Sequence, residues 1–134
     1  MLVPACILIL VMLAAIAVDS AGLYLAHREM QGLADGAAND VATAALDLDA
    51  FYLDSETLVI NDRQASELTR QIIERWQTDS ATTTRITEVQ VTVAAATVRV
   101  VIEAEADPVF APAVLGGSSS ITITAIGQAT ARAQ

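Results

Sequence analysis

Few side chains in this sequence have the chemistry of a catalytic or metal-binding site. His27 is the only imidazole and Cys6 the only thiol among the 134 residues. A single thiol cannot form a disulfide within the chain, and a single imidazole cannot build a site that needs several histidines. The patterns G-x-S-x-G and H-E-x-x-H and the phosphate-binding P-loop do not occur. We therefore expect neither an enzyme nor a bound cofactor.

The densest group of carboxylates lies in the middle of the chain, at Asp47, Asp49, Asp54 and Glu56. Clustered carboxylates bind hard cations such as calcium. The calcium-loop pattern also needs a glycine, and no glycine occurs between positions 37 and 115. We expect a solvated acidic loop here and no metal site.

The overall charge argues against nucleic acid as a partner. The formal net charge is −9, and the seven basic residues, all Arg, form no run. A protein that binds nucleic acid through its phosphates needs clustered positive charge. The composition points instead to an apolar environment, because 54% of the residues are hydrophobic and the mean hydropathy is +0.50.

An uninterrupted apolar segment occupies residues 1–18, and the first charged residue is Asp19. As a helix, this segment spans about 27 Å, close to the hydrocarbon thickness of a bilayer. A domain of this size cannot bury such a helix on all sides. The segment is therefore predicted to be a membrane helix.

Two other interpretations of the segment stay open. A cleaved secretory signal would use small residues such as Ala15, Ala17 or Ala21, yet no Lys or Arg precedes the apolar run. A lipoprotein is suggested by the short stretch from Val3 to Cys6, but the apolar run follows this cysteine instead of preceding it. We interpret Cys6 as a small apolar residue of the membrane helix.

The segment 19–46 is predicted to continue the helix as an amphipathic half. Its small and apolar residues recur at steps of three and four, which is one face of a helix. This face consists of Leu23, Ala26, Met30, Leu33, Ala34, Ala37, Val41, Ala44 and Ala45. The two halves together make a helix of about 45 residues and about 68 Å.

Three polar or small residues of this half need separate interpretation. Asp19 is expected to be an interfacial carboxylate in water, with a charge on a neighbouring subunit as the alternative partner. Gly32 and Gly36 have the G-x-x-x-G spacing. We expect them to pack against their own domain.

The remainder, 47–134, is predicted to be a small α/β head. Asn61 or Asp62 caps a helix that ends near Asp79 and faces the sheet with Ala65, Leu68, Ile72 and Trp76. Alternating residues predict strands at 86–93, 98–106 and from Ile121 onward, the first two antiparallel. A short strand is expected at 58–60, and Glu67 and Arg70 form at most a weak surface pair.

Between the second and third strands, the apolar stretch PVFAPAVL follows a strand-breaking Asp107-Pro108 pair. Phe110, Val114 and Leu115 are expected to form a lid over the core, with an exposed subunit contact as the alternative. The fold class is thus α+β, with one long helix, one further helix and an antiparallel sheet of three to four strands.

The first 40 residues resemble the N-terminal signature of the TadE/TadG-like pseudopilins, which are minor pilins of the tight-adherence (Tad/Flp) pilus. The matching residues are Ala17-Val18-Asp19, Leu23-Tyr24-Leu25-Ala26, Arg28, Met30-Gln31 and Ala34-Asp35-Gly36-Ala37-Ala38. Position 5 is Ala, where many type IV pilins carry Glu, and no basic stretch precedes the apolar run.

The resemblance implies a pilin-like fold and a structural role. The chain would sit in the bacterial cytoplasmic membrane with one span (1–18) and its head outside, and then enter an extracellular pilus. Its partners would be the bilayer, the assembly machinery and other pilin-like subunits. The alternative is a single-span envelope protein with a small binding domain that does not polymerise. The expected assembly and membrane interface is Leu2, Val3, Ile7, Leu8, Leu10, Val11, Leu13, Ile16, Asp19, Leu23 and Met30.

Overall fold

The structure of the protein is a computed structural model that describes residues 2–45, 60–80, 84–112 and 120–131. The acidic group from Asp47 to Glu56, residues 58 and 59 of the strand expected at 58–60, and Val114 and Leu115 lie outside these residues. The elements in these described ranges are, in chain order, α1 (Leu2–Ala44), α3 (Asp62–Asp79), β1 (Arg85–Ala94), β2 (Thr97–Ala106) and β3 (Ile121–Thr130).

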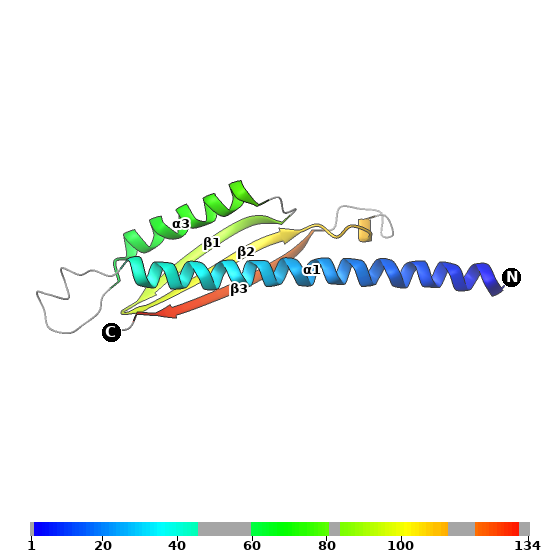
Figure 1. Ribbon diagram of the computed structural model, residues 1–134, viewed down its shortest axis with the longest axis horizontal. Coiled ribbons are helices and arrows are strands. Elements are labelled where there is room, and N and C mark those ends of the chain that lie inside the picture. Colours follow the sequence, from blue (N-terminus) through cyan, green and yellow to red (C-terminus); the bar gives the residue numbers. More distant parts are fainter. Residues whose placement is uncertain (1, 46–59, 81–83, 113–119, 132–134) are drawn as a thin grey trace, which may run out of the picture.

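The three strands form one antiparallel sheet in the order β1-β2-β3, and both helices cover the same face of it. The C-terminal half of α1 packs on β2 and β3, while α3 lies beside α1 and against β1 (Figure 1). The N-terminal half of α1 projects beyond this two-layer head (Figure 1). This arrangement confirms the predicted α+β class with a long helix, a second helix and a small antiparallel sheet.

The long helix α1 is continuous through the boundary between its apolar and amphipathic halves. Its 43 residues give a length of about 65 Å at 1.5 Å per residue. Pro4 lies in the first turn, where the amide that proline lacks has no partner within the helix. One rigid element therefore joins the apolar segment to the core of the head.

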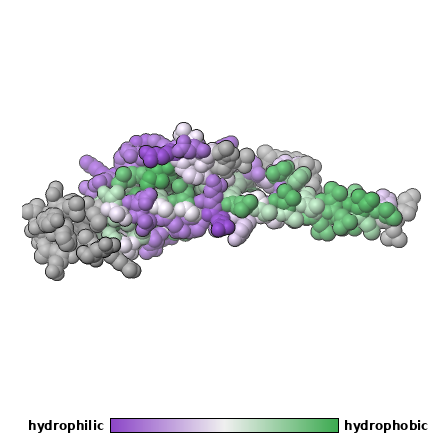
Figure 2. Space-filling model, in the orientation of Figure 1, coloured by the Kyte–Doolittle hydropathy of each residue, from purple (hydrophilic) through white to green (hydrophobic). Residues whose placement is uncertain are grey.

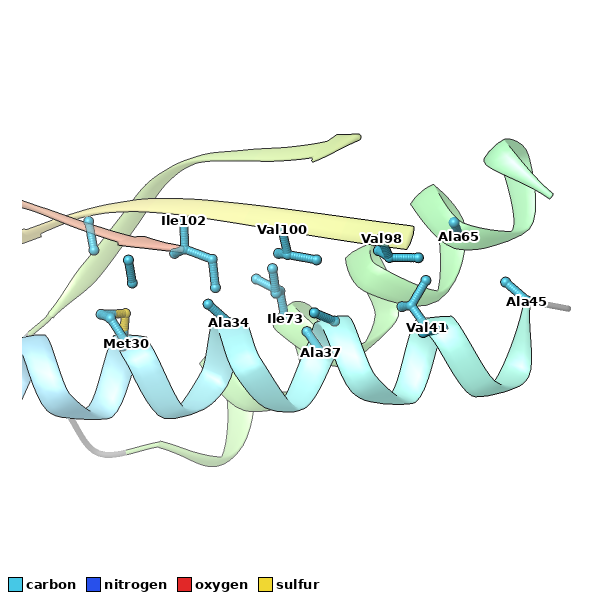
Figure 3. Packing of buried hydrophobic residues seen from close by; sticks show 14 of the residues in the cluster. Met30, Ala34, Ala37, Val41, Ala45, Ala65, Ile73, Val98, Val100 and Ile102 are labelled. Atoms are coloured by element: carbon cyan, nitrogen blue, oxygen red, sulfur yellow. The ribbon is translucent and has the colours of Figure 1, made fainter. Parts of the chain in front are cut away.

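The buried face of α1 is the predicted one, shifted slightly around the helix. Its residues contact the sheet through small side chains, which bring the helix axis close to the strands (Figure 3). Ala44 lies at the rim of this face and is exposed, contrary to the prediction. The buried members are Met30, Ala34, Ala37, Ala38, Val41, Ala42 and Ala45.

The closeness of α1 to β3 depends on Gly127. A Cβ built on Gly127 would collide with the carbonyl group of Ala34 and would stand 2.6 Å from the amide nitrogen of Asp35. Gly32 and Gly36, in contrast, have no atom within 4 Å of an added Cβ. The expectation that these two glycines pack against their own domain is therefore wrong, because they lie on the face of α1 opposite Ala34.

The alternation of the strands is largely as predicted. All five inward residues of β2 are buried, from Val98 to Ala106, and the inward residues of β1 are half-buried because β1 is an edge strand. In β3, Ile123 and Ala125 are buried, whereas Ile121 at the strand's start is 41% exposed. The other face of the sheet is polar or half-exposed, which makes the head two layers thick.

The β1–β2 connection is a tight hairpin in which Ala94 pairs with Thr97. Ala95 adopts a positive φ of 53°, a region that favours glycine. Its carbonyl accepts a hydrogen bond from the amide of Ile60 at 3.4 Å. Of the short strand expected at 58–60, the structure describes only this bridge at Ile60.

The second helix, α3, begins at the predicted cap. The side-chain oxygen of Asn61 accepts hydrogen bonds from the amides of Arg63 (3.1 Å) and Gln64 (3.2 Å). The fully buried row is Ala65, Thr69 and Ile73, and the predicted Leu68, Ile72 and Trp76 are only half-buried beside it. Thr69 enters this row because its hydroxyl donates to the carbonyl of Ala65 at 2.8 Å.

Candidate functional site

The described part of the chain leaves the apolar half of α1 almost entirely uncovered. Within it, the described side chains are exposed except for Ala15, which is partly covered, and Figure 2 shows them as a hydrophobic rod that extends from a more polar head. By length and composition the helix is long and apolar enough to cross a membrane. The expected interface residues Val3, Ile7, Leu8, Leu10, Val11, Leu13 and Ile16 all lie on this open surface. The side chain of Leu2 lies outside the described part of the chain.

Met30 requires a correction. Its side chain is completely buried in the core of the head, beside Ala34 and Ile102 (Figure 3). It is therefore a core residue and presents no surface to a lipid or a neighbouring subunit. Helical periodicity could not separate it from the interface residues, because the apolar stripe runs without interruption from one half of α1 into the other.

Asp19 has partners within its own chain. Its Oδ1 accepts hydrogen bonds from the amides of Val109 (2.8 Å) and Phe110 (3.0 Å). Its Oδ2 accepts from the amides of Ala111 (2.8 Å) and, more weakly, Phe110 (3.2 Å). Asp19 is half-buried, so the expectation of a carboxylate free in water is wrong. It fastens the chain segment 107–112, hereafter the 107–112 turn, to the point where the apolar half of α1 ends.

The 107–112 turn does not cover the core. Pro108 is buried, but Val109 and Phe110 are 72% and 42% exposed. Neither belongs to the core of the head. Of the three residues expected to form a lid, Phe110 therefore lies away from the core, in a turn that lies along α1 and exposes two large apolar side chains; Val114 and Leu115 lie outside the described residues.

An apolar groove of about 340 Å³ separates the 107–112 turn from α1. One wall is formed by α1, from Met12 in the apolar half to Leu23 in the amphipathic half. The other wall is formed by the turn and the start of β3. The lining residues are Met12, Ile16, Asp19, Ser20, Leu23, Pro108, Ala111 and Ile121.

Gln31 holds α1 to the free edge of β3. Its Nε2 donates to the carbonyl of Ile126 at 2.8 Å, and its Oε1 accepts from the amide of Ile126 at 3.4 Å. The same Nε2 is 3.2 Å from Asp35 Oδ2. The amide side chain thus takes the place of a paired strand at this residue.

Charge on the head is spread over solvent-exposed side chains. Arg70 of α3 pairs with Glu67 and with Glu74, and all three side chains are more than half exposed. Hydrogen bonds, first from Arg70 and then from Gln71, hold the pKa of the Glu67 carboxyl below its usual range. Hydrogen bonds to Glu67 and Glu74 raise the pKa of Arg70. Within the described ranges, no group of three or more His, Cys, Asp or Glu residues is placed to hold a metal ion.

Comparison of the chain with protein-family models, with curated proteins and with solved structures finds no match. Function must therefore be argued from the apolar helix and its junction with the head. Residue patterns did not reveal Gln31, Gly127 or the partners of Asp19 as parts of this junction. Each acts through a contact with a segment about 90 positions away, and no local periodicity reports such a contact.

Proposed function

We propose that this chain is a structural subunit of a filament, pilin-like or a minor pilin of a Tad/Flp-type pilus. The observation that carries the proposal is the double use of one helix. Buried residues between Met30 and Ala45, at the C-terminal end of α1, build the core of the head, whereas the residues from Val3 to Val18 are exposed except for the partly covered Ala15. A rigid apolar rod attached to a compact head suits a subunit that anchors in a bilayer and then packs in a bundle of like helices.

The mechanism is transfer of apolar surface between two apolar surroundings. In the membrane the side chains of residues 3–18 contact lipid, and in the filament they contact the same helices of neighbouring subunits. Because lipid is itself apolar, helix packing in the bundle depends on van der Waals contact and on the few polar groups nearby. The resemblance of the stretch from Ala17 to Ala38 to TadE/TadG-like proteins supports a pilus of this type.

A direct test detects the chain in filaments sheared from the surface of the native host. A photo-crosslinking amino acid at Leu10, in the exposed apolar half of α1, should give a ladder of crosslinked subunits in the sheared fraction. The same amino acid at Thr92, an exposed position of the head, serves as the control and should give a weaker ladder or none. A chain that is found only in the membrane fraction, without Leu10 crosslinks, would contradict the proposal.

A second candidate function is a membrane-anchored binding domain that does not polymerise. It is favoured by β1, a ten-residue strand whose outer edge pairs with no strand in the described part of the chain. A partner could add a strand along this edge. Neighbouring genes for a secretion ATPase and a prepilin peptidase would favour the pilus; their absence, with no chain in sheared filaments, would favour the binding domain.

A further inference from the structure

The 107–112 turn lies at the depth where the apolar half of α1 should leave the membrane. It shares a groove with Met12 and Ile16, and Asp19 binds its backbone. The uninterrupted apolar segment ends at Val18, and Asp19 is the first charged residue that follows it, so α1 should leave the hydrocarbon near Asp19. The 107–112 turn and the last part of the membrane-spanning half of α1 therefore lie at the same depth relative to the bilayer.

We propose that the 107–112 turn is a membrane-contacting segment that inserts Val109 and Phe110 into the phospholipid bilayer beside α1. The stretch from Pro108 to Ser120 carries no charged residue, and the turn exposes both large side chains. Tyr24 and Leu25, also exposed, continue the apolar surface of α1 past Asp19. A tyrosine such as Tyr24 at this level is typical of the interface between lipid and water.

Asp19 makes such an insertion possible. Irregular backbone is costly next to lipid because its amides find no water to bond with. The carboxylate of Asp19 satisfies the amides of Val109, Phe110 and Ala111 together. In return, the three amides satisfy a carboxylate that would otherwise be costly at this depth. The charged group and the irregular turn thus enter the membrane interface as one hydrogen-bonded unit.

The groove between the turn and α1 indicates lipid as the occupant. Met12 lies seven residues before Asp19, about 10 Å further along the helix axis. The groove therefore reaches into the level of the hydrocarbon, where acyl chains are the apolar molecules present before any filament forms. Pro108 and Ala111 of the turn line the groove, so a lipid bilayer that fills it also meets Val109 and Phe110, the exposed residues between them.

The test places a fluorescent reporter in the turn of the full chain. Phe110→Trp in a Trp76→Phe background is reconstituted into phosphatidylcholine vesicles, with and without lipid brominated near the carboxyl end of the acyl chain. Trp at 110 should emit at shorter wavelength than in detergent-free denaturant and should be quenched by the brominated lipid. Gln128→Trp in the same background is the matched control. Gln128 is exposed and lies seven strand residues from Ile121, about 23 Å along β3, so it should not be quenched.

Two outcomes would overturn the proposal. Emission typical of water at position 110, with no more quenching than at position 128, would place the turn outside the membrane. A blue shift that increases with protein density, with no quenching by the brominated lipid, would show that a second copy of the chain covers Val109 and Phe110. Val109→Trp gives an independent reading if the Phe110 variant does not fold, as judged by circular dichroism. The vesicles contain no assembly machinery, so this experiment tests membrane contact of the turn independently of whether the chain forms a pilus.

Discussion

Gly127 in β3 lies directly against the backbone of Ala34 in α1, so a missing side chain sets the distance between the helix and the sheet. Replacing Gly127 with Ala forces a methyl group into the carbonyl of Ala34, and backbone atoms cannot move aside as a flexible side chain can. We expect Gly127→Ala to destabilise the head by about 1–3 kcal/mol or more. Urea unfolding of the full chain in detergent micelles, followed by Trp76 fluorescence, measures the loss.

A matched substitution on the opposite face of α1 should act in the other direction. Gly36 has open space around an added Cβ and lies in the interior of the helix. Gly36→Ala is therefore expected to stabilise the chain by about 1 kcal/mol, because alanine is the better helix former. Equal destabilisation by Gly36→Ala and Gly127→Ala in the same urea assay would contradict the packing described for α1.

The backbone of the hairpin between β1 and β2 is strained at one residue, and a substitution by glycine should relieve this strain. Ala95 has a positive φ of 53°, which costs a residue with a Cβ about 1 kcal/mol or more. Ala95→Gly should raise the free energy of unfolding by a comparable amount. Ala96→Gly is the control and should bring no gain, since positive φ among the described non-glycine residues is confined to Ala95.

Removal of the Asp19 carboxylate should loosen the 107–112 turn without unfolding the head. Asp19→Ala removes the acceptor of three exposed or part-buried amides, and each lost hydrogen bond should cost about 0.5–1.5 kcal/mol. Hydrogen–deuterium exchange should become faster at Val109, Phe110 and Ala111 while β2 stays protected. Asp40→Ala removes an exposed carboxylate from the same helix and should leave exchange in the turn unchanged. Unaltered exchange in the Asp19 variant would refute the capping role.

Cys6 offers a native reporter for the membrane span. It is a free, exposed thiol in the apolar half of α1, so a bilayer would shield it from a charged, water-soluble maleimide. We expect Cys6 to remain unlabelled in intact membranes and to react after denaturation in detergent. Thr92→Cys in a Cys6→Ser background is the control and should react in both conditions. Equal labelling of the two positions in membranes would contradict a membrane-spanning α1.

The ion pairs of α3 make a prediction about pH. Hydrogen bonding by Arg70 lowers the pKa of Glu67, so the ionised carboxylate is favoured in the folded state. The resulting stabilisation is present at neutral pH and is lost as the pH falls through the lowered pKa. It is small, because both side chains are more than half exposed. In a carbon-13 NMR titration, Arg70→Gln should raise the pKa of Glu67 toward its usual value, whereas Arg75→Gln should not.

Periodic parts of the molecule were predictable from the sequence, since their patterns follow from helix and strand geometry. The inward residues of β2, the cap at Asn61 and the buried face of α1 are examples. Two adjacent rows of side chains along α3 have the same helical spacing. The periodicity therefore predicted Leu68 and Ile72 as buried, whereas the structure buries Thr69 and Ile73. The local pattern contains no information about which row the neighbouring strand will cover.

The junction between helix and head was not predictable in the same way. In the sequence, Asp19 is a polar residue at the end of an apolar run, and no neighbouring residue indicates that Phe110 is its partner. The stretch around Phe110 reads as apolar, which is compatible with a lid over the core or an outward-facing turn. Only the folded chain decides between them, because the deciding hydrogen bonds join residues 90 to 92 positions apart.

The position of Gln31 limits how copies of this chain can associate through their strands. Gln31 occupies both backbone groups of Ile126, midway along β3, whereas the outer edge of β1 pairs with no strand among the residues that the structure describes. Two heads can therefore join β1 to β1 into a six-stranded sheet, using the three strands of each. Each end of that sheet is then a β3 edge on which Gln31 already bonds both backbone groups of Ile126, and this disfavours the addition of a further strand there.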